Sequence, residues 1–294
     1  MGSNNTNLPL ILLRALLAKG WDPKARYWPK VGGNTANTGF LEYSGGRCFV
    51  KMHSNAALLS AEDAGLVALE PWLKVPRILG RFSDETGGVL FLDALALEPL
   101  GLAGWRAAGV ALAQLHSQAV HTVYGGVTDN FIGGTPQYNK NDTDWCRFFA
   151  RQRLLPQLDW AQHKGLSKAT CLQVHRVVKY LPRWLPRAPA SGLLHGDLWV
   201  GNLGQIDGSE PVFFDPACYY GDPQVDLAML NLFGQPPEAF YQGYQGRLPD
   251  NHQRGRWPVY DLYHWLNHFN LFGQQYAAAV ADTARSLCQQ LDGY

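Results

Sequence analysis

The arrangement of hydrophobic and polar residues divides the chain into two regions of different character. Up to about residue 93, short apolar runs alternate with glycine-rich or polar turns, a pattern typical of strands in an antiparallel sheet. From Leu100 onward, apolar residues recur every three or four positions, which is the period of helices with one buried face. The pattern therefore predicts an α+β protein in which a sheet precedes a mainly helical region.

Five strands are expected in the first region. One strand-like stretch precedes the glycine-containing segment Val31–Thr38, and a second one, Phe40–Tyr43, follows it. Cys48–Met52 follows after a Ser-Gly-Gly turn, and Lys74–Gly80 and Gly88–Asp93 complete a five-stranded antiparallel sheet.

The second region is expected to form helices around a long loop. The segments with helical periodicity, including two in the first region, are residues 8–18, 56–69, 105–116, 144–158, 166–181 and 260–273. The glycine-rich loop at residues 124–139 either lines a site or is a disordered surface excursion. We expect an N-terminal lobe of residues 1–93 and a C-terminal lobe of residues 94–294, joined by a hinge at about residues 93–97.

Composition narrows the possible classes of protein. The chain has 294 residues, 46% hydrophobic and 17% charged, as expected for a folded protein of two lobes. Its net charge of +1 gives no reason to expect binding to nucleic acid or to an anionic membrane. No run of about eighteen apolar residues predicts a transmembrane helix. The five cysteines form no CxxC pair, so neither a zinc site nor a disulfide framework is expected, and a cytoplasmic location fits.

The candidate catalytic residues lie in the sequence LLHGDLWVGN, residues 193–202, and just after it. Asp197 precedes Asn202 by five positions, and Asp215 follows the next apolar run, which is the catalytic-loop pattern of kinases. In phosphoryl transfer the first acid deprotonates the attacking hydroxyl, while the asparagine and the second acid hold Mg²⁺ on the phosphates. The pattern predicts a kinase with Asp197 as the base and Asn202 and Asp215 as metal ligands.

The residues around this motif refine the prediction. His195 is expected to link the loop to the backbone and not to act as a base. The pair Asp222-Pro223 predicts a helix soon after Asp215, which leaves no room for the long activation segment of regulated protein kinases. Asp226 on that helix could support the catalytic loop, although a solvated aspartate is the simpler interpretation. The chain contains no G-x-S-x-G elbow and no H-E-x-x-H pair, so a serine hydrolase or a zinc enzyme is not supported.

The residues expected to bind the nucleotide lie in the first region. A lysine near a strand end pairs the α- and β-phosphates in kinases, and its usual partner is a helical glutamate. Lys51 and Glu62 have these positions, although each alone could be an ordinary solvated side chain.

Two further segments could contact the nucleotide through their backbone. A glycine loop can bring N–H groups to the phosphates, although an ordinary hairpin loop has the same composition. The connector after the fifth strand could pair with the adenine edge, although a plain linker would look similar. The candidates are Gly32, Gly33 and Asn34 in the loop and Asp93, Ala94 and Leu95 in the connector.

Longer stretches of the chain resemble the fructosamine kinase family, relatives of the aminoglycoside phosphotransferases within the protein-kinase-like fold. The matching stretches are GGN, FVK, LAQLH, DNFIGGTPQYN, LLHGDLWVGN, FFDPACYYGDPQVDLAM and LNHFNLFG, and they extend over nearly the whole chain. The resemblance implies a two-lobed protein-kinase-like fold and phosphorylation of the 3-hydroxyl of ketosamines with ATP and Mg²⁺. Ketosamines such as fructosamine or ribulosamine are sugar adducts on protein lysines or free amines. Their 3-phosphates break down spontaneously, which is deglycation.

The resemblance also bears on individual residues. It implies for the catalytic and nucleotide-binding candidates the same roles as above. Trp199, which lies two residues after Asp197, could stack on a sugar face, and His268 is a second candidate for contact with the sugar. A lone tryptophan is otherwise more often part of the core. The chain departs from the family pattern at Val200, where serine is usual, at Asp93, where glutamate is common, and at Ala94, where a bulkier residue is usual. These departures concern the hinge and the acceptor preference, and they leave the base and the metal ligands in place.

Two alternatives stay open. Another small-molecule kinase of this fold could act on an aminoglycoside, choline or a sugar. An aminoglycoside kinase is expected to surround its polycationic substrate with acids, and acidic residues do not cluster after Asp226. A non-catalytic pseudokinase would be favoured by loss of the catalytic residues, but all of them are present. The oligomeric state is left open, with a monomer favoured.

Overall fold

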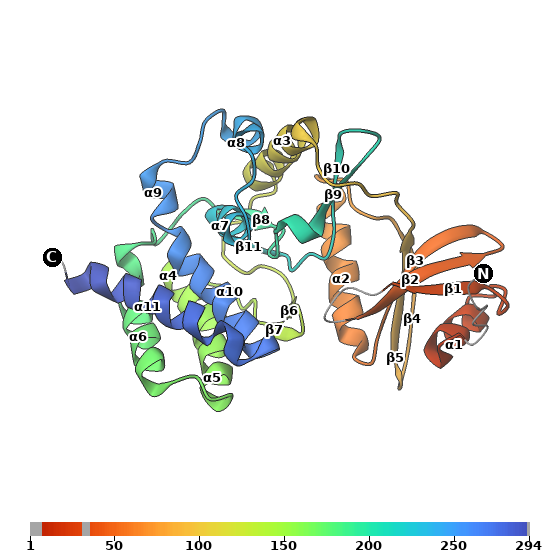
Figure 1. The fold of residues 1–294 in the computed structure, drawn as a ribbon, viewed down its shortest axis with the longest axis horizontal. Helices are drawn as coiled ribbons and strands as arrows, with labels where there is room; N and C mark the ends of the chain where they lie inside the picture. Colours follow the sequence, from red (N-terminus) through yellow and green to blue (C-terminus); the bar gives the residue numbers. More distant parts are fainter. Residues whose placement is uncertain (1–7, 31–35, 293–294) are drawn as a thin grey trace.

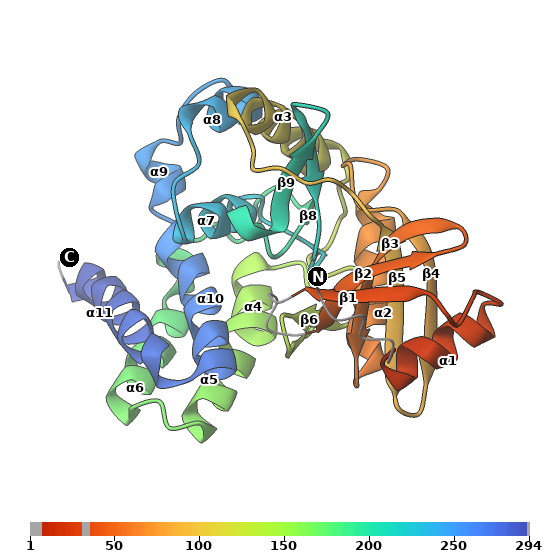
Figure 2. The ribbon, with the colours of Figure 1, turned by 45° about the vertical axis from the view of Figure 1, so that its right-hand side comes forward.

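The computed structural model describes residues 8–30 and 36–292. They form a five-stranded sheet with two helices and a larger part made mainly of helices (Figures 1 and 2). The predicted order of sheet and then helices is confirmed. The glycine-loop candidates Gly32, Gly33 and Asn34 lie outside the described residues, so their predicted role is untested.

The sheet has the strand order β1-β2-β3-β5-β4, and every neighbouring pair is antiparallel. The strands are β1 (Arg26–Lys30), β2 (Asn37–Tyr43), β3 (Gly46–His53), β4 (Ile78–Asp84) and β5 (Gly87–Asp93). The fourth strand begins four residues later than predicted, because the backbone before it bonds elsewhere. The Lys74 carbonyl accepts a hydrogen bond from Phe213 N at 2.9 Å, and Arg77 N donates to the Asp93 carboxylate at 2.7 Å.

Alternation along β3 decides where Lys51 points. Val50 packs into the core formed with α1 (Leu10–Ala18), on one face of the sheet. Successive side chains of a strand point to opposite faces, so Lys51 lies on the other face, toward α2 (Ala56–Leu69). Glu62 is on α2, so the strand and the helix bring the two candidates together.

The larger part of the molecule is mainly helical (Figure 1). Its helices are α3 (Leu102–Gln118), α4 (Trp145–Phe149), α5 (Leu155–His163), α6 (Lys168–Lys179), α7 (Gln224–Leu232), α8 (Glu238–Gln245), α9 (Asn251–Arg254), α10 (Trp257–Phe272) and α11 (Ala277–Asp292). Three short antiparallel pairs lie among them: β6 (Asn130–Ile132) with β7 (Thr135–Gln137), β8 (Gly192–Leu194) with β11 (Tyr219–Gly221), and β9 (Leu203–Ile206) with β10 (Glu210–Phe213). Within the described ranges, every helix is too short or too polar to cross a membrane.

Two glycines allow α3 and α8 to pack at close range. A Cβ atom on Gly109 would collide with the carbonyl oxygen of Phe240, and one on Gly243 would collide with that of Arg106. This close packing fixes the position of α3, which also carries His116. His116 Nε2 lies 3.1 Å from the carboxylate of Asp226 on α7.

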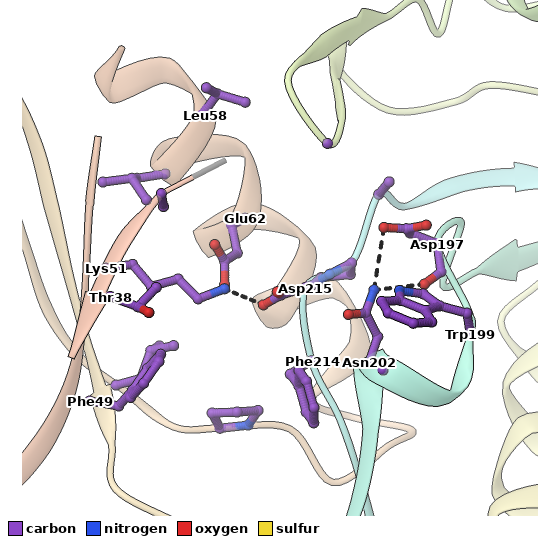
Figure 3. A pocket seen from close by; sticks show the side chains of 18 of the residues that line it. Thr38, Phe49, Lys51, Leu58, Glu62, Asp197, Trp199, Asn202, Phe214 and Asp215 are labelled. Carbon is purple, nitrogen blue, oxygen red and sulfur yellow. Dashed lines mark hydrogen bonds and ion pairs between the residues drawn. The ribbon is translucent and has the colours of Figure 1, made fainter. Parts of the chain in front are cut away.

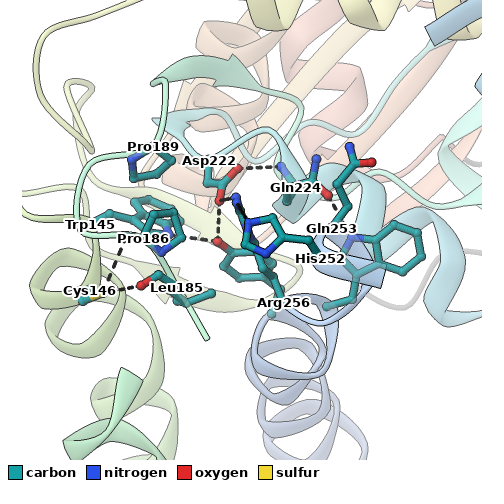
Figure 4. A network of polar contacts seen from close by, with 12 residues as sticks. Trp145, Cys146, Leu185, Pro186, Pro189, Asp222, Gln224, His252, Gln253 and Arg256 are labelled. Atoms are coloured by element: carbon teal, nitrogen blue, oxygen red, sulfur yellow. Dashed lines mark hydrogen bonds and ion pairs between the residues drawn. The ribbon is translucent and has the colours of Figure 1, made fainter. Parts of the chain in front are cut away.

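Asp222 connects the start of α7 to two other helices (Figure 4). Its buried carboxylate accepts hydrogen bonds from Gln224 N at 3.0 Å, from Arg256 at 3.1 Å and from the Tyr260 hydroxyl at 2.7 Å. The Tyr260 hydroxyl in turn accepts a hydrogen bond from the Trp145 indole at 3.0 Å. These contacts fix the point where α7 begins, shortly after the catalytic segment, as the sequence predicts.

Candidate active site

A cavity of about 1060 Å³ lies between the sheet and the helical part. Figure 3 shows Lys51, Glu62, Asp197, Asn202 and Asp215 gathered at this cavity, from both sides of the molecule. The remaining candidates in the described part of the chain also line it: Asp93, Ala94, Leu95, Trp199 and His268. The fold therefore brings residues from six separate stretches of sequence to one site.

Lys51 is buried between two carboxylates. Its Nζ atom lies 2.6 Å from Oε1 of Glu62 and also forms an ion pair with Asp215. Burial by itself lowers the pKa of a lysine, but the charges of Glu62 and Asp215 raise the pKa of Lys51 above its ordinary value. The interpretation of Lys51 and Glu62 as solvated side chains is wrong, because their side chains are only 9% and 14% exposed.

Asp226 holds the loop that carries Asp197. Its fully buried carboxylate accepts hydrogen bonds from the backbone N–H groups of His195 at 2.8 Å and Gly196 at 2.9 Å, and it contacts His116 Nε2 at 3.1 Å. Burial raises the pKa of a carboxyl group, but here the hydrogen bond and charge of His116 lower the pKa of Asp226 below its ordinary value. The predicted support of the loop is present, and the simpler interpretation of a solvated aspartate is wrong.

Gly196 and His195 link the catalytic loop to the segment around Asp215. Gly196 has φ +83°, and a Cβ atom there would collide with the Ala217 carbonyl oxygen, so the position requires glycine. His195 Nε2 lies 3.1 Å from the Phe214 carbonyl oxygen. Burial lowers the pKa of His195, so the neutral imidazole can donate this hydrogen bond. The expected link through His195 is therefore present.

Asp197 and Asn202 lie side by side at the cavity. The Asn202 Nδ2 group donates to the Asp197 carbonyl oxygen at 2.9 Å and to Asp197 Oδ2 at 3.3 Å. Burial, and then the negative charge of Asp215, raise the pKa of Asp197 to about 7. A general base works best when its pKa lies near the working pH, so this environment suits proton uptake.

The side-chain oxygens of Asn202 and Asp215 fit a magnesium ion. Within residues 8–30 and 36–292, Asn202 Oδ1 accepts no hydrogen bond, and the Asp215 side chain is 46% exposed. Mg²⁺ is usually bound by one or two protein oxygens together with substrate phosphates. The described residues contain no cluster of three or more His, Cys, Asp or Glu that could hold a metal.

The connector lies against the cavity directly after β5. Asp93 N donates to the Arg77 carbonyl oxygen at 2.9 Å, and the Asp93 carboxylate accepts from Arg77 N at 2.7 Å. Because its carboxylate is engaged in this way, Asp93 fixes the direction of the chain into residues 94–97, all of which line the cavity.

The cavity has an aromatic wall, of which the sequence indicates only Trp199 and His268. It consists of Trp199, Phe233, His268, Phe272 and Tyr276. The Phe233 ring lies 5.9 Å from Trp199 and 5.0 Å from His268, and Tyr276 lies 5.1 Å from His268, between ring centroids. The spacing of four residues between His268 and Phe272 could have indicated a shared helix face. Nothing local in the sequence indicates Phe233 or Tyr276.

The glycine-rich loop also contributes to the site. It contains the hairpin of β6 and β7, and its residues Phe131 and Gly133 line the cavity. Of the two interpretations left open for this loop, the site-lining one is confirmed and the disordered excursion is wrong.

The fold and the site together define a class of protein. A five-stranded antiparallel sheet is followed by a helical part, and a Lys–Glu pair faces an Asp, an Asn and a second Asp across one cavity. An aminoglycoside phosphotransferase solved with AMP-PNP and hygromycin B shares this fold with a TM-score of 0.68 and 14% identity, over 96% of this chain and 99% of that one. The chain therefore has a protein-kinase-like fold.

Closer relatives identify the family. The family model for fructosamine kinase matches residues 18–290. A probable ketoamine kinase of Synechocystis sp. is 39% identical over 84% of this chain and 85% of that protein, and one of Escherichia coli K12 is 34% identical over 83% and 86%. The structure of the candidate fructosamine-3-kinase of Thermobifida fusca matches with a TM-score of 0.81 and 28% identity, over 98% of this chain and all of that one. The chain belongs to the fructosamine kinase family, and it is an ATP-dependent kinase.

Proposed function

We propose that this kinase phosphorylates the 3-hydroxyl of ketosamines, the sugar adducts formed on protein lysines or free amines. Membership of the fructosamine kinase family supports a ketosamine as acceptor. The 3-phosphate product would then break down spontaneously and release the amine, so the activity would result in deglycation.

The observation that carries this proposal over an aminoglycoside acceptor is the charge of the cavity. Its carboxylates, among the described residues, are Glu62, Asp93, Asp197 and Asp215, and none of them belongs to the aromatic wall. A polycationic acceptor needs acids around its several ammonium groups. A ketosamine has one amine beside a sugar, and aromatic rings can contact both a sugar face and a single cation.

In the proposed reaction Asp197 accepts the proton of the acceptor 3-hydroxyl. The hydroxyl oxygen forms a bond to the γ-phosphorus, the bond between that phosphorus and the β–γ bridging oxygen breaks, and ADP leaves. The partly buried position of Asp197 and its contact with Asn202 orient the carboxylate for this transfer.

The remaining candidates would bind ATP. Lys51, positioned by Glu62, would pair with the α- and β-phosphates, and Asn202 and Asp215 would hold Mg²⁺. Bound there, Mg²⁺ would neutralise charge on the phosphates. The backbone of Asp93, Ala94 and Leu95 would contact the adenine edge, and the glycine loop before β2 would cover the phosphates.

An acceptor panel tests the proposed function. With ATP and Mg²⁺, we expect the protein to phosphorylate ribulosamine and fructosamine, and to leave kanamycin, choline and free sugars unphosphorylated, as measured by ADP release and mass of the product. Phosphorylation of kanamycin or choline alone would show that the acceptor is wrong. A protein that binds ATP but phosphorylates none of these acceptors would fit the pseudokinase alternative.

We expect Trp199→Ala to raise the KM for the ketosamine by about tenfold, because loss of an aromatic contact with a sugar is worth about 1.4 kcal/mol. The KM for ATP should stay near its native value, because in this proposal Trp199 contacts the acceptor and not the nucleotide. Steady-state kinetics with each substrate varied in turn provides the measurement. Trp28→Ala is the matched control, since Trp28 is similarly exposed (44% against 37%) but lies outside the cavity lining. An unchanged ketosamine KM in Trp199→Ala would remove this residue from the acceptor site.

A further inference from the structure

The hairpin of β6 and β7 carries buried amide and hydroxyl side chains that no step of the proposed reaction uses. Gln137 is 1% exposed, and Thr135 and Asn139 are also buried. A buried polar side chain is costly unless it is hydrogen-bonded, so its partners indicate what it does. In this hairpin the partners form two groups, one near Asp215 and one near the aromatic wall.

The first group of hydrogen bonds reaches the backbone just after Asp215. Gln137 Nε2 donates to the Ala217 carbonyl oxygen at 3.0 Å, and Asn130 Nδ2 donates to the Cys218 carbonyl oxygen at 2.7 Å. Gln137 Nε2 also donates to Asn130 Oδ1 at 2.9 Å, so the two amides orient each other. These bonds use both carbonyls that lie two and three residues beyond the candidate metal ligand.

Asp215 needs support of this kind because of its backbone. Its φ is +58°, in the left-handed region that residues other than glycine adopt at a cost. On its other side, Phe214 N donates to the Asn202 carbonyl oxygen at 3.1 Å, and the Phe214 carbonyl oxygen contacts His195. Asp215 is thus the strained residue between two fixed segments, and the hairpin fixes the second of them.

The second group of hydrogen bonds reaches α10 at the aromatic wall. Thr135 Oγ1 donates to Asn267 Oδ1 at 2.5 Å. Gln157 Nε2 donates to both, at 3.1 Å to Thr135 Oγ1 and at 3.2 Å to Asn267 Oδ1. Asn267 lines the cavity and immediately precedes His268, so the hairpin is bonded to the side chain next to His268 of the aromatic wall.

Arg153 keeps the hairpin in place from behind. The sequence predicts an unbroken helix across residues 144–158, but a π-helical turn at Ala150–Leu154 interrupts it and carries this fully buried arginine. Its Nη2 atom donates to Asn139 Oδ1 at 2.7 Å, and its guanidinium lies 3.8 Å from the Tyr219 ring centroid. Asn139 Nδ2 in turn donates to Asn130 Oδ1 at 3.1 Å.

We propose that the β6–β7 hairpin is a positioning element that fixes the position of the Asp215 carboxylate relative to the aromatic wall. Gln137 and Asn130 position Asp215 for the metal-bound nucleotide, and Thr135 positions Asn267 and His268 for the acceptor. The acceptor half of this inference rests on the proposed function, whereas the metal half does not depend on which acceptor is used.

The two halves are tested with a pair of near-isosteric variants. Gln137→Met keeps the length of the side chain and removes its amide, with the bonds to the Ala217 carbonyl, Asn130 and the Tyr263 hydroxyl. Thr135→Val keeps the shape and removes the hydroxyl. For Gln137→Met we expect Mn²⁺ binding in the presence of AMP-PNP, followed by electron paramagnetic resonance, to weaken by about tenfold, the effect of losing about one hydrogen bond. Amide hydrogen exchange across residues 215–220 should become faster. For Thr135→Val we expect unchanged Mn²⁺ binding and a higher KM for the ketosamine.

Asn130→Ala is the second variant for the metal half, because Asn130 is only partly buried and its loss is easier for the fold to tolerate. It should weaken Mn²⁺ binding in the same direction as Gln137→Met. Native Mn²⁺ binding in both variants would overturn the proposal. The proposal would also be overturned if all three variants showed the same weakening of Mn²⁺ binding and the same rise in the ketosamine KM, both in proportion to their loss of thermal stability. That result would indicate that the hairpin is purely structural. If the native protein phosphorylates no ketosamine, the proposed function fails, while the Mn²⁺ and exchange measurements still decide the metal half.

Discussion

Asp197→Ala is expected to lower turnover by about 10²-fold or more, the usual contribution of a general base. The environment of this carboxylate favours proton uptake, since burial and the charge of Asp215 raise the pKa of Asp197 to about 7. Nucleotide binding should remain close to native, because the ion pairs of Lys51 with Glu62 and Asp215 do not involve Asp197.

This prediction is checked by kcat with saturating substrates together with the Kd for AMP-PNP from calorimetry. Asp197→Asn is the companion variant, because it keeps the shape and the contact with Asn202 but cannot accept the proton. Asp159→Ala is the control, since Asp159 is an exposed aspartate of α5 outside the cavity lining. Near-native turnover in either Asp197 variant would contradict its assignment as the base.

Asp226→Asn is expected to destabilise the protein by about 3 kcal/mol, the loss typical of breaking a buried charged network. Three groups donate to or contact the native carboxylate: His195 N, Gly196 N and His116 Nε2. The amide oxygen of an asparagine cannot accept from all three, so at least one buried donor is left unpaired. Because two of these groups belong to the loop that carries Asp197, turnover should fall as well.

Urea denaturation followed by circular dichroism measures the change in the free energy of unfolding, and kcat is measured on the same preparations. Asp282→Asn is the matched control, since Asp282 is exposed and pairs only with Arg285 three residues away among the described residues. That control should change stability by less than about 0.5 kcal/mol. Native stability in Asp226→Asn would mean that the buried carboxylate does not support the loop.

Much of the site could be predicted from the sequence because its signals are local. Two signals identified the kinase chemistry, and each spans only a few residues. One is the spacing of Asp197 and Asn202 within one loop, and the other is the position of Asp215 after an apolar run. The β3 lysine and the α2 glutamate were predicted as a pair, and the structure places their side chains 2.6 Å apart. Alternation along a strand is also local, so the face on which Lys51 lies follows from its neighbours.

Other expectations could not be decided locally. Asp226 has the appearance of a solvated helix residue in the sequence, and it is buried only because α3 and α7 meet beneath the catalytic loop. The loop at residues 124–139 has the composition of a disordered segment, yet its amides bond to carbonyls about eighty residues away. The interruption of the helix at Ala150–Leu154 likewise has no signal of its own in the sequence.

The sequence alone determined the order of strands and helices, the family and the chemistry of the catalytic loop, because periodicity and short motifs depend on neighbouring residues. Only the tertiary structure decided which distant residues share the cavity. Phe233 and Tyr276 join Trp199 and His268 in the aromatic wall, and the β6–β7 hairpin reaches the backbone beside Asp215. Such contacts depend on how whole elements pack against one another, since close packing and the pairing of every buried polar group are properties of the complete fold.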